Sequence, residues 1–183
     1  ILAEIFDELV PHVKAGVTTM SIEEKARELM KERSVEPAFL NYGSGRVKFP
    51  AVTCISINEI LVHGIPGERI IQDGDIVKID MGIKKNSYFS DMARTFMIGN
   101  VTDHEQDLVA STKWVLDEVI RRLANFDNLA QLGGFIESEM NKKKYSVIRE
   151  YTGHGIGKAL HESPPVPNYY LAEMESVTIK PGM

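Results

Sequence analysis

Residues Ile79–Asp91 read IDMGIKKNSYFSD, a stretch that predicts a β-hairpin with one acidic residue on each arm. A two-residue turn at Lys85 and Asn86 would place Asp80 directly opposite Asp91 on one face of the hairpin. Directly opposed Cβ atoms lie about 5 Å apart, so two bare carboxylates at these positions would repel each other. The hairpin therefore predicts either a solvated acidic pair or two carboxylates that bind divalent metal ions.

Helix patterns precede and follow the hairpin. Apolar spacing predicts a helix at the start of the chain, and Ser21 with Glu24 forms a capping box for a helix of about 13 residues that ends near Arg33. A second capping box, Thr102 with Glu105, opens another helix. A further helix is predicted from a cap at Asn128 to about residue 143.

Strand patterns form a separate block. They predict strands at 52–57 and 60–62 and hairpin arms at 76–83 and 88–98. Helices and a largely antiparallel sheet in separate blocks favour an α+β fold.

Size and composition restrict the class of protein. The chain has 183 residues, 43% of them apolar, which suits one domain, or two small ones, with a proper core. Its net charge of -5, with no basic stripe, argues against binding to nucleic acid or to a membrane surface. The single cysteine, Cys54, cannot form an internal disulfide, which is compatible with a reducing compartment such as the cytosol. No apolar run approaches the roughly 20 residues that span a bilayer.

Candidate metal ligands lie in the hairpin and in a glycine-rich segment. Asp80 interrupts an apolar run, so its carboxylate needs a partner if the strand is buried. His154 lies between Gly153 and Gly155, and a neutral imidazole together with carboxylates suits manganese, iron, cobalt or zinc. On its own, a Gly-His-Gly segment is also compatible with a histidine in a flexible turn.

Two other histidines are candidates for catalysis. His161 and His63 each have the chemistry to donate a hydrogen bond to a developing oxyanion or to accept a proton. Taken singly, each fits a surface histidine, or one whose hydrogen bonds are already satisfied, better than a catalytic one.

Five segments together resemble the bacterial-type (type I) methionine aminopeptidases, which have the pita-bread fold. They occur in the family's order, with 11 and 63 positions separating Asp80, Asp91 and His154, and they are residues 54–66, 75–82, 90–96, 153–157 and 161–169. The resemblance implies an incomplete pita-bread domain over residues 1–183, in which helices cover an antiparallel sheet.

The resemblance also implies individual roles. Asp80 would bind one of two divalent ions (cobalt, manganese, iron or zinc), Asp91 would bridge both, and His154 would hold the other. His161 would contact the scissile peptide and His63 would bind substrate near the cleaved bond. A water that bridges the metals would then release the N-terminal methionine of a nascent protein.

The same resemblance implies a substrate pocket and a cellular setting. The methionine side chain would enter an apolar pocket that includes Tyr42, Phe49 and Cys54. A segment at 43–48 is longer than the family's short glycine link and would reshape the pocket wall. We expect a cytoplasmic monomer that acts on N-terminal Met peptides of nascent chains, near the ribosome, and that binds neither nucleic acid nor membrane.

The two ends of the sequence differ from those expected for a complete member of the family. The family's last two ligands are glutamates on strands that follow a segment like Ile179–Met183, and the chain opens at Ile1 inside an amphipathic pattern. The sequence therefore resembles an enzyme truncated at both ends, and we expect this segment alone to be inactive. Two alternatives stay open: an Xaa-Pro aminopeptidase of the same fold, and a non-catalytic binding module.

Overall fold

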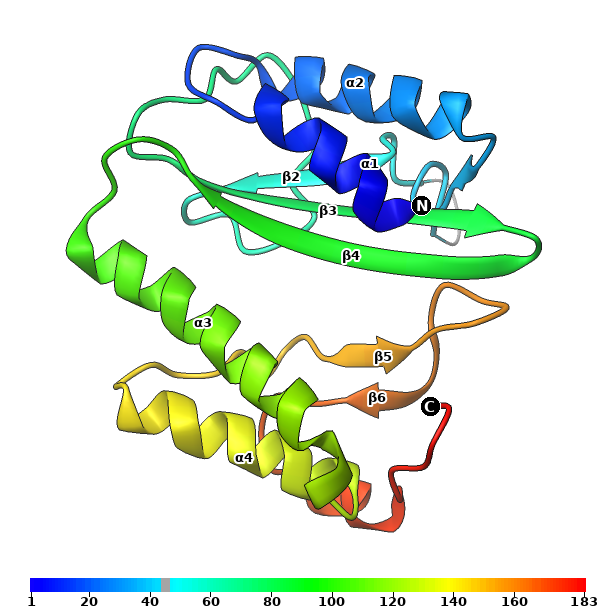
Figure 1. The fold of residues 1–183 in the computed structure, drawn as a ribbon, viewed down its shortest axis with the longest axis vertical. Helices are drawn as coiled ribbons and strands as arrows, with labels where there is room; N and C mark the ends of the chain where they lie inside the picture. The colour runs from blue at the N-terminus through cyan, green and yellow to red at the C-terminus, as the bar shows by residue number, and fades with distance from the viewer. Residues whose placement is uncertain (44–46) are drawn as a thin grey trace. The chain divides into compact units, whose positions relative to one another are not determined.

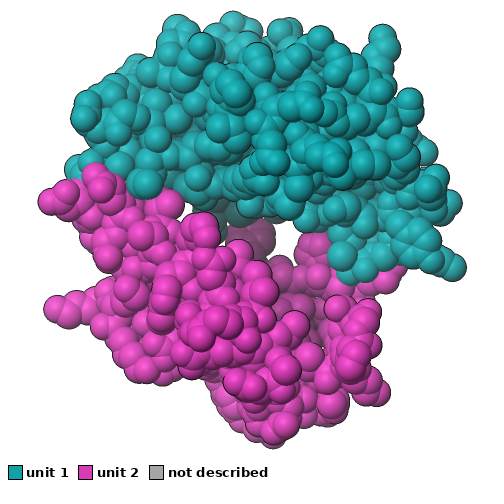
Figure 2. Space-filling view, in the orientation of Figure 1, with its two compact units in different colours: residues 1–102, 156–160 teal, residues 103–155, 161–183 magenta. Residues whose placement is uncertain are grey.

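The computed structural model describes residues 1–43 and 47–183 (Figure 1). It contains two compact units, which are residues 1–102 with 156–160 and residues 103–155 with 161–183 (Figure 2). None of the helices in these described residues has the length and apolar character needed to span a lipid bilayer.

The first unit is built on a four-stranded antiparallel sheet. Its central strand β3 (Ile76–Lys85) pairs with β1 (Glu36–Pro37), β2 (Thr53–Ile57) and β4 (Tyr88–Met97). The arms of the predicted hairpin are thus confirmed as β3 and β4. Residues 60–62, predicted as a strand, form none, and their side chains are exposed.

The predicted turn of the hairpin is wrong by one position. The two-residue turn is Asn86-Ser87, so Lys85 pairs with Tyr88 and Asp80 lies opposite Ala93 instead of Asp91. Asn86 and Ser87 have φ angles of 51° and 68°. A turn with two left-handed residues matches the twist of the strands, and asparagine adopts this conformation more readily than lysine.

Two helices cover one face of this sheet (Figure 1). They are α1 (Leu2–Leu9) and α2 (Thr19–Glu32), and a short 3₁₀ turn (Val10–His12) follows α1. Their apolar faces join the inward side chains of β3 in one core, which includes Phe6, Leu29 and Ile79. Helix α2 begins earlier than predicted, because Thr18 is its cap and its hydroxyl accepts a hydrogen bond from the backbone N–H of Ser21.

A buried carboxylate fastens α2 to β2. Glu23 is almost completely buried and accepts hydrogen bonds from the backbone N–H groups of Val52 (2.8 Å) and Thr53 (2.9 Å). The hydroxyl of Thr53 also donates to Glu23 at 2.6 Å, and Nε of Arg27 donates at 2.7 Å. This set of partners compensates the burial of the charge and fixes the start of β2.

The second unit packs two helices beside a short hairpin. Its elements are α3 (Asp103–Arg122), a 3₁₀ turn (Leu123–Asn125), α4 (Leu129–Lys142), β5 (Gly153–Gly155), β6 (Glu162–Val166) and a 3₁₀ turn (Ala172–Ser176). Val119 of α3 packs with Leu129 and Leu132 of α4. The predicted cap is confirmed, because Oδ1 of Asn128 accepts a hydrogen bond from the N–H of Gln131 at 2.9 Å.

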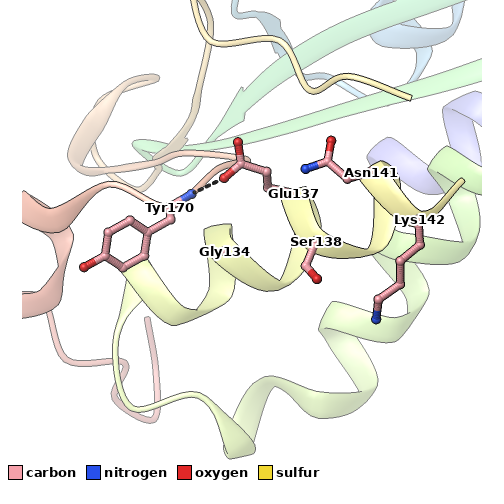
Figure 3. A pocket seen from close by; sticks show the side chains of 6 residues that line it. All are labelled: Gly134, Glu137, Ser138, Asn141, Lys142 and Tyr170. Carbon is pink, nitrogen blue, oxygen red and sulfur yellow. Dashed lines mark hydrogen bonds between the residues drawn. The ribbon is translucent and has the colours of Figure 1, made fainter. Parts of the chain in front are cut away.

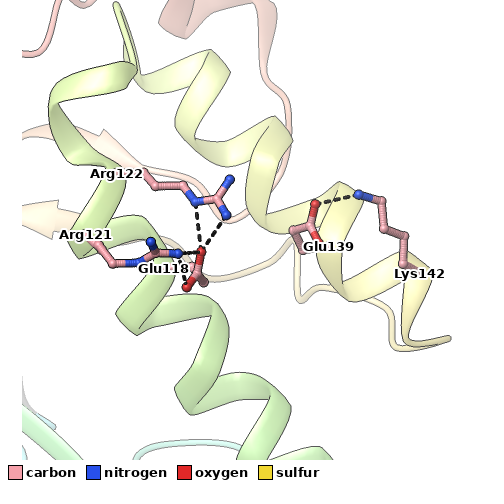
Figure 4. A network of polar contacts seen from close by, with 5 residues as sticks. All are labelled: Glu118, Arg121, Arg122, Glu139 and Lys142. Carbon is pink, nitrogen blue, oxygen red and sulfur yellow. Dashed lines mark hydrogen bonds and ion pairs between the residues drawn. The ribbon is translucent and has the colours of Figure 1, made fainter.

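Charged side chains lie on the surfaces of α3 and α4 (Figure 4). Glu118 pairs with Arg121 and Arg122, while Lys142 donates to Glu139 at 2.6 Å. The cationic partners in these pairs are exposed, so the pairs contribute little to stability.

Candidate metal centre

The two aspartates of the hairpin interact despite the corrected register. Asp91 lies opposite Gly82, two positions along β3 from Asp80, so both aspartates keep the same face of the sheet. The pKa of Asp80 is raised to about 7, first because its carboxyl group is buried, and further by the negative charge of Asp91 and a hydrogen bond with it. Both side chains are only partly exposed, so the two carboxyl groups are not fully solvated.

Cys54 lies beside this acidic pair. It is the register partner of Asp80 on the neighbouring strand β2. The pKa of its thiol is raised to about 12, mainly by burial and then by the charges of Asp80, Asp91 and Glu23. Cys54 is thus a neutral side chain that contributes an apolar surface next to the carboxylates.

An apolar cluster continues from Cys54. It joins Cys54 to Ala38, Phe39 and Leu160, with Phe49 and Phe89 packed against them. Two of the three predicted pocket residues, Phe49 and Cys54, therefore lie in one cluster.

Tyr42 is placed differently from the other pocket residues. Its side chain is exposed, although its backbone exchanges hydrogen bonds of 2.9 Å with Phe39 and Phe49. The predicted reshaping of the pocket wall by 43–48 falls partly on 44–46, which lie outside the described residues.

Gly82 allows this cluster to approach the acidic pair. A Cβ atom at Gly82 would lie 2.9 Å from Cε1 of Phe39 and 3.0 Å from Cβ of Ala38. Contacts this short require neighbouring atoms to shift, so only glycine lets Phe39 pack directly on β3 opposite Asp91.

Two of the predicted histidines lie together in the second unit. The ring centroids of His154 and His161 are 4.1 Å apart. Nδ1 of His154, on β5, lies 2.9 Å from the carbonyl oxygen of Gly155. When Nδ1 carries the proton for that hydrogen bond, Nε2 keeps a lone pair for a metal ion.

Steric crowding explains why the residue after His154 is a glycine. A Cβ atom at Gly155 would lie 2.6 Å from the carbonyl oxygen of Ser163, at an irregularity between β5 and β6. The backbone around His154 is therefore held by a close approach that a larger residue would disrupt. This rules out the reading of Gly-His-Gly as a merely flexible turn.

A family model described as metallopeptidase family M24 matches residues 1–183. The chain belongs to this family.

Individual relatives give the same result. The chain is 36% identical over 183 residues to "Methionine aminopeptidase 1" of Bacillus subtilis (strain 168), covering all of this chain and 72% of that protein. The crystal structure of methionine aminopeptidase from Thermotoga maritima superposes with a TM-score of 0.91 at 31% identity, covering 99% of this chain and 71% of that one. The resemblance to methionine aminopeptidases and the α+β pita-bread fold are thereby confirmed.

A more distant structure shares the fold alone. Prolidase from Pyrococcus furiosus has a TM-score of 0.73 at 23% identity, covering 98% of this chain and 51% of that one. The Xaa-Pro alternative therefore has the support of the fold only.

Membership of family M24 implies divalent metal ions, and the acidic pair fits them. Two partly buried carboxyl groups that share a hydrogen bond, one of them with a raised pKa, would gain from a nearby cation. Among the described residues, no three His, Cys, Asp or Glu side chains gather as a ligand group. The assignment of His154 to the same site therefore rests on the order of the family's motifs.

The remaining predicted residue, His63, lies in the first unit. It is exposed and has a left-handed backbone with φ of 59°. Such a conformation is uncommon for a histidine and persists where the surroundings hold it.

Sequence reasoning missed several residues of this site. Phe39, Phe89 and Leu160 belong to the apolar cluster, yet they come from separate segments with no shared periodicity. The glycine at position 82, inside an apolar strand pattern, was a usable signal of close approach.

A shallow depression on α4 contains none of the predicted site residues (Figure 3). Glu137 on its rim accepts a hydrogen bond from the N–H of Tyr170 at 3.2 Å and also pairs with Arg149. The contact with Tyr170 ties the segment after β6 to α4, and the pair with Arg149 ties the segment before β5 to it, which gives the depression a structural explanation.

Proposed function

We propose that this M24 chain carries the metal-binding aspartates and the methionine pocket of an enzyme that removes N-terminal methionine from nascent proteins. The observation that carries the proposal is the partly buried pair Asp80 and Asp91, with Cys54 and its apolar cluster directly beside Asp80. A carboxylate pair for a cation and an apolar surface for a thioether side chain thus lie in one unit. The 36% identity to a methionine aminopeptidase supports the same activity.

The proposed ligands are Asp80, Asp91 and His154. Asp80 and Asp91 would hold the ions through their deprotonated carboxylate oxygens. His154 would hold an ion through Nε2, because its Nδ1 faces the carbonyl oxygen of Gly155. Two divalent ions of cobalt, manganese, iron or zinc would supply Lewis acidity and lower the pKa of a water molecule.

The substrate is held by the other predicted residues. Phe49 and Cys54 exclude water around the methionine side chain, and Tyr42 forms the outer wall of the pocket. His161 and His63 donate hydrogen bonds to the scissile peptide, whose carbonyl oxygen gains negative charge during the reaction. Each of these histidines is thus assigned a binding and a catalytic role.

The cellular setting is proposed on chemical grounds. A chain with one cysteine, the buried Cys54, suits a reducing compartment such as the cytoplasm, where nascent chains emerge from the ribosome. The net charge of -5 disfavours direct contact with nucleic acid or with an anionic membrane surface. We propose a monomer that meets its substrates as short, flexible N-termini.

The test is release of methionine from a Met-Ala-Ser peptide by the protein expressed from its complete gene, loaded with Mn²⁺. We expect release that requires metal and that disappears in Asp80→Asn, while Lys84→Met, on the same strand, retains it. Cleavage of Xaa-Pro peptides in place of Met-Ala-Ser would favour the prolidase-like activity. Absence of both cleavage and Mn²⁺ binding would favour a non-catalytic module and overturn the proposal.

A further inference from the structure

Residues 58–63 form a loop that includes His63. The side chains of this loop are exposed, but its backbone is held by hydrogen bonds. The loop begins at Asn58, whose N–H donates to the carbonyl of Ile76 at 3.0 Å and whose Oδ1 accepts from the N–H of Ile76 at 2.9 Å. It ends at Gly64, which donates to Oγ of Ser56 at 3.0 Å and accepts from Ile55 at 2.8 Å. Both ends are therefore fastened to the sheet.

Lys78 holds the loop between these ends. Its ammonium group donates to the carbonyl oxygen of Asn58 at 2.6 Å and to that of Ile60 at 2.7 Å. A lysine has three N–H donors, so the loop occupies two of them, and hydrogen bonds from a charged donor are stronger than neutral ones. The half-buried ammonium group of Lys78 thus attaches the loop to β3 through two of its carbonyl groups.

The position of Lys78 links this attachment to the acidic pair. Lys78 and Asp80 are two residues apart on β3, so they project from the same face of the strand. Lys84, another lysine on that face, pairs with Glu36 at 3.7 Å instead of with the loop. Strand β3 therefore contains, two positions apart, the proposed metal ligand Asp80 and the lysine that holds the loop.

We propose that Lys78 is a positioning residue that fixes the loop 58–63, and through it His63, relative to Asp80. The left-handed backbone of His63 needs such support, because a flexible loop would relax it. The inference deepens the proposed function and rests on it for the role of His63, whereas the attachment of the loop is a separate structural claim.

The first experiment measures the loop directly. Backbone amide hydrogen exchange of residues 59–63 is compared in the unaltered protein, Lys78→Met, Lys78→Arg and Lys84→Met. Methionine keeps the apolar stem and removes the donors, so we expect exchange about 10-fold faster in Lys78→Met only, with Lys78→Arg close to the unaltered protein. Unchanged exchange in Lys78→Met would overturn the inference, whatever the protein's peptidase activity.

The second experiment asks whether Lys78 acts through His63. We expect Lys78→Met to lower kcat/KM for Met-Ala-Ser roughly 10- to 100-fold, with Mn²⁺ affinity changed less than about 2-fold. In a His63→Ala background the same substitution should cost less than about 2-fold, because the positioned group is already absent. A full loss in that background would overturn the positioning role.

The two claims fail in different ways. If the unaltered, metal-loaded protein releases no methionine, the proposed function fails, while the exchange measurement still decides the attachment. If methionine is released but Lys78→Met has unchanged kcat/KM, the function stands and the positioning role fails. Circular dichroism and a thermal melt of each variant distinguish loss of positioning from loss of folding.

Discussion

Replacing Asp80 with asparagine is expected to make the metal-free protein more stable at neutral and alkaline pH. The folded-state pKa of Asp80 is raised from 3.8 to about 7, so the folded protein retains a proton that the unfolded chain has released. The free energy of unfolding therefore decreases as pH rises from about 4 to about 7, and the penalty is constant at higher pH. Asparagine carries no charge at any of these pH values, so the variant avoids the penalty.

The size of the effect follows from the shift. One pKa unit corresponds to about 1.4 kcal/mol, so the rise to about 7 gives an upper value of about 4 kcal/mol. Asp80 is only partly buried, and solvent reduces the charge interactions. We therefore expect Asp80→Asn to raise the free energy of unfolding by about 1–3 kcal/mol at about pH 8, and by little at about pH 4.

Urea unfolding in the presence of EDTA, at several pH values, measures this difference. Asp117→Asn is a matched control, because Asp117 is exposed on α3 and pairs with Lys113 at the surface. Asp91→Asn should also raise the free energy of unfolding at about pH 8, because it removes a negative charge that raises the pKa of Asp80. If Asp80→Asn is no more stable than the unaltered protein at about pH 8, the conclusion that ionisation of Asp80 destabilises the metal-free fold is wrong.

Three further substitutions test the surroundings of the pair by urea unfolding. Glu23→Ala should cost about 2–4 kcal/mol, because the buried N–H groups of Val52 and Thr53 lose their acceptor; a cost below about 1 kcal/mol would contradict this anchor. Gly82→Ala should cost about 1–3 kcal/mol through the contact with Phe39, and a neutral result would show that the cluster relaxes freely. Asn128→Ala should cost about 1 kcal/mol through loss of the helix cap, whereas Asn128→Asp should be nearly neutral.

The hairpin shows how far sequence reasoning reaches. Its existence and arms followed from apolar alternation, and the same-face relation of Asp80 and Asp91 survived because the register differed by two positions. The turn itself was misplaced, since its position depends on which residues accept a left-handed backbone, here Asn86 and Ser87.

Other differences have equally local causes. Residues 60–62 are apolar enough to read as a strand, yet the loop is held by Lys78, and no strand pairs with it in the described part of the chain. The apolar cluster around Cys54 contains Phe39 and Leu160, which come from segments far apart in the sequence. A periodic pattern within one segment cannot predict packing between distant segments. The proposed metal ligands came from the order of the family's motifs, which carries information that periodicity lacks.

Titration of the protein with Mn²⁺ by isothermal calorimetry, in two buffers of different ionisation enthalpy, tests the metal assignment most directly. We expect binding near pH 7 that releases a proton from Asp80, and we expect both the binding and the proton release to be lost in Asp80→Asn. Mn²⁺ binding of unchanged affinity in Asp80→Asn, without proton release in either protein, would contradict the assignment.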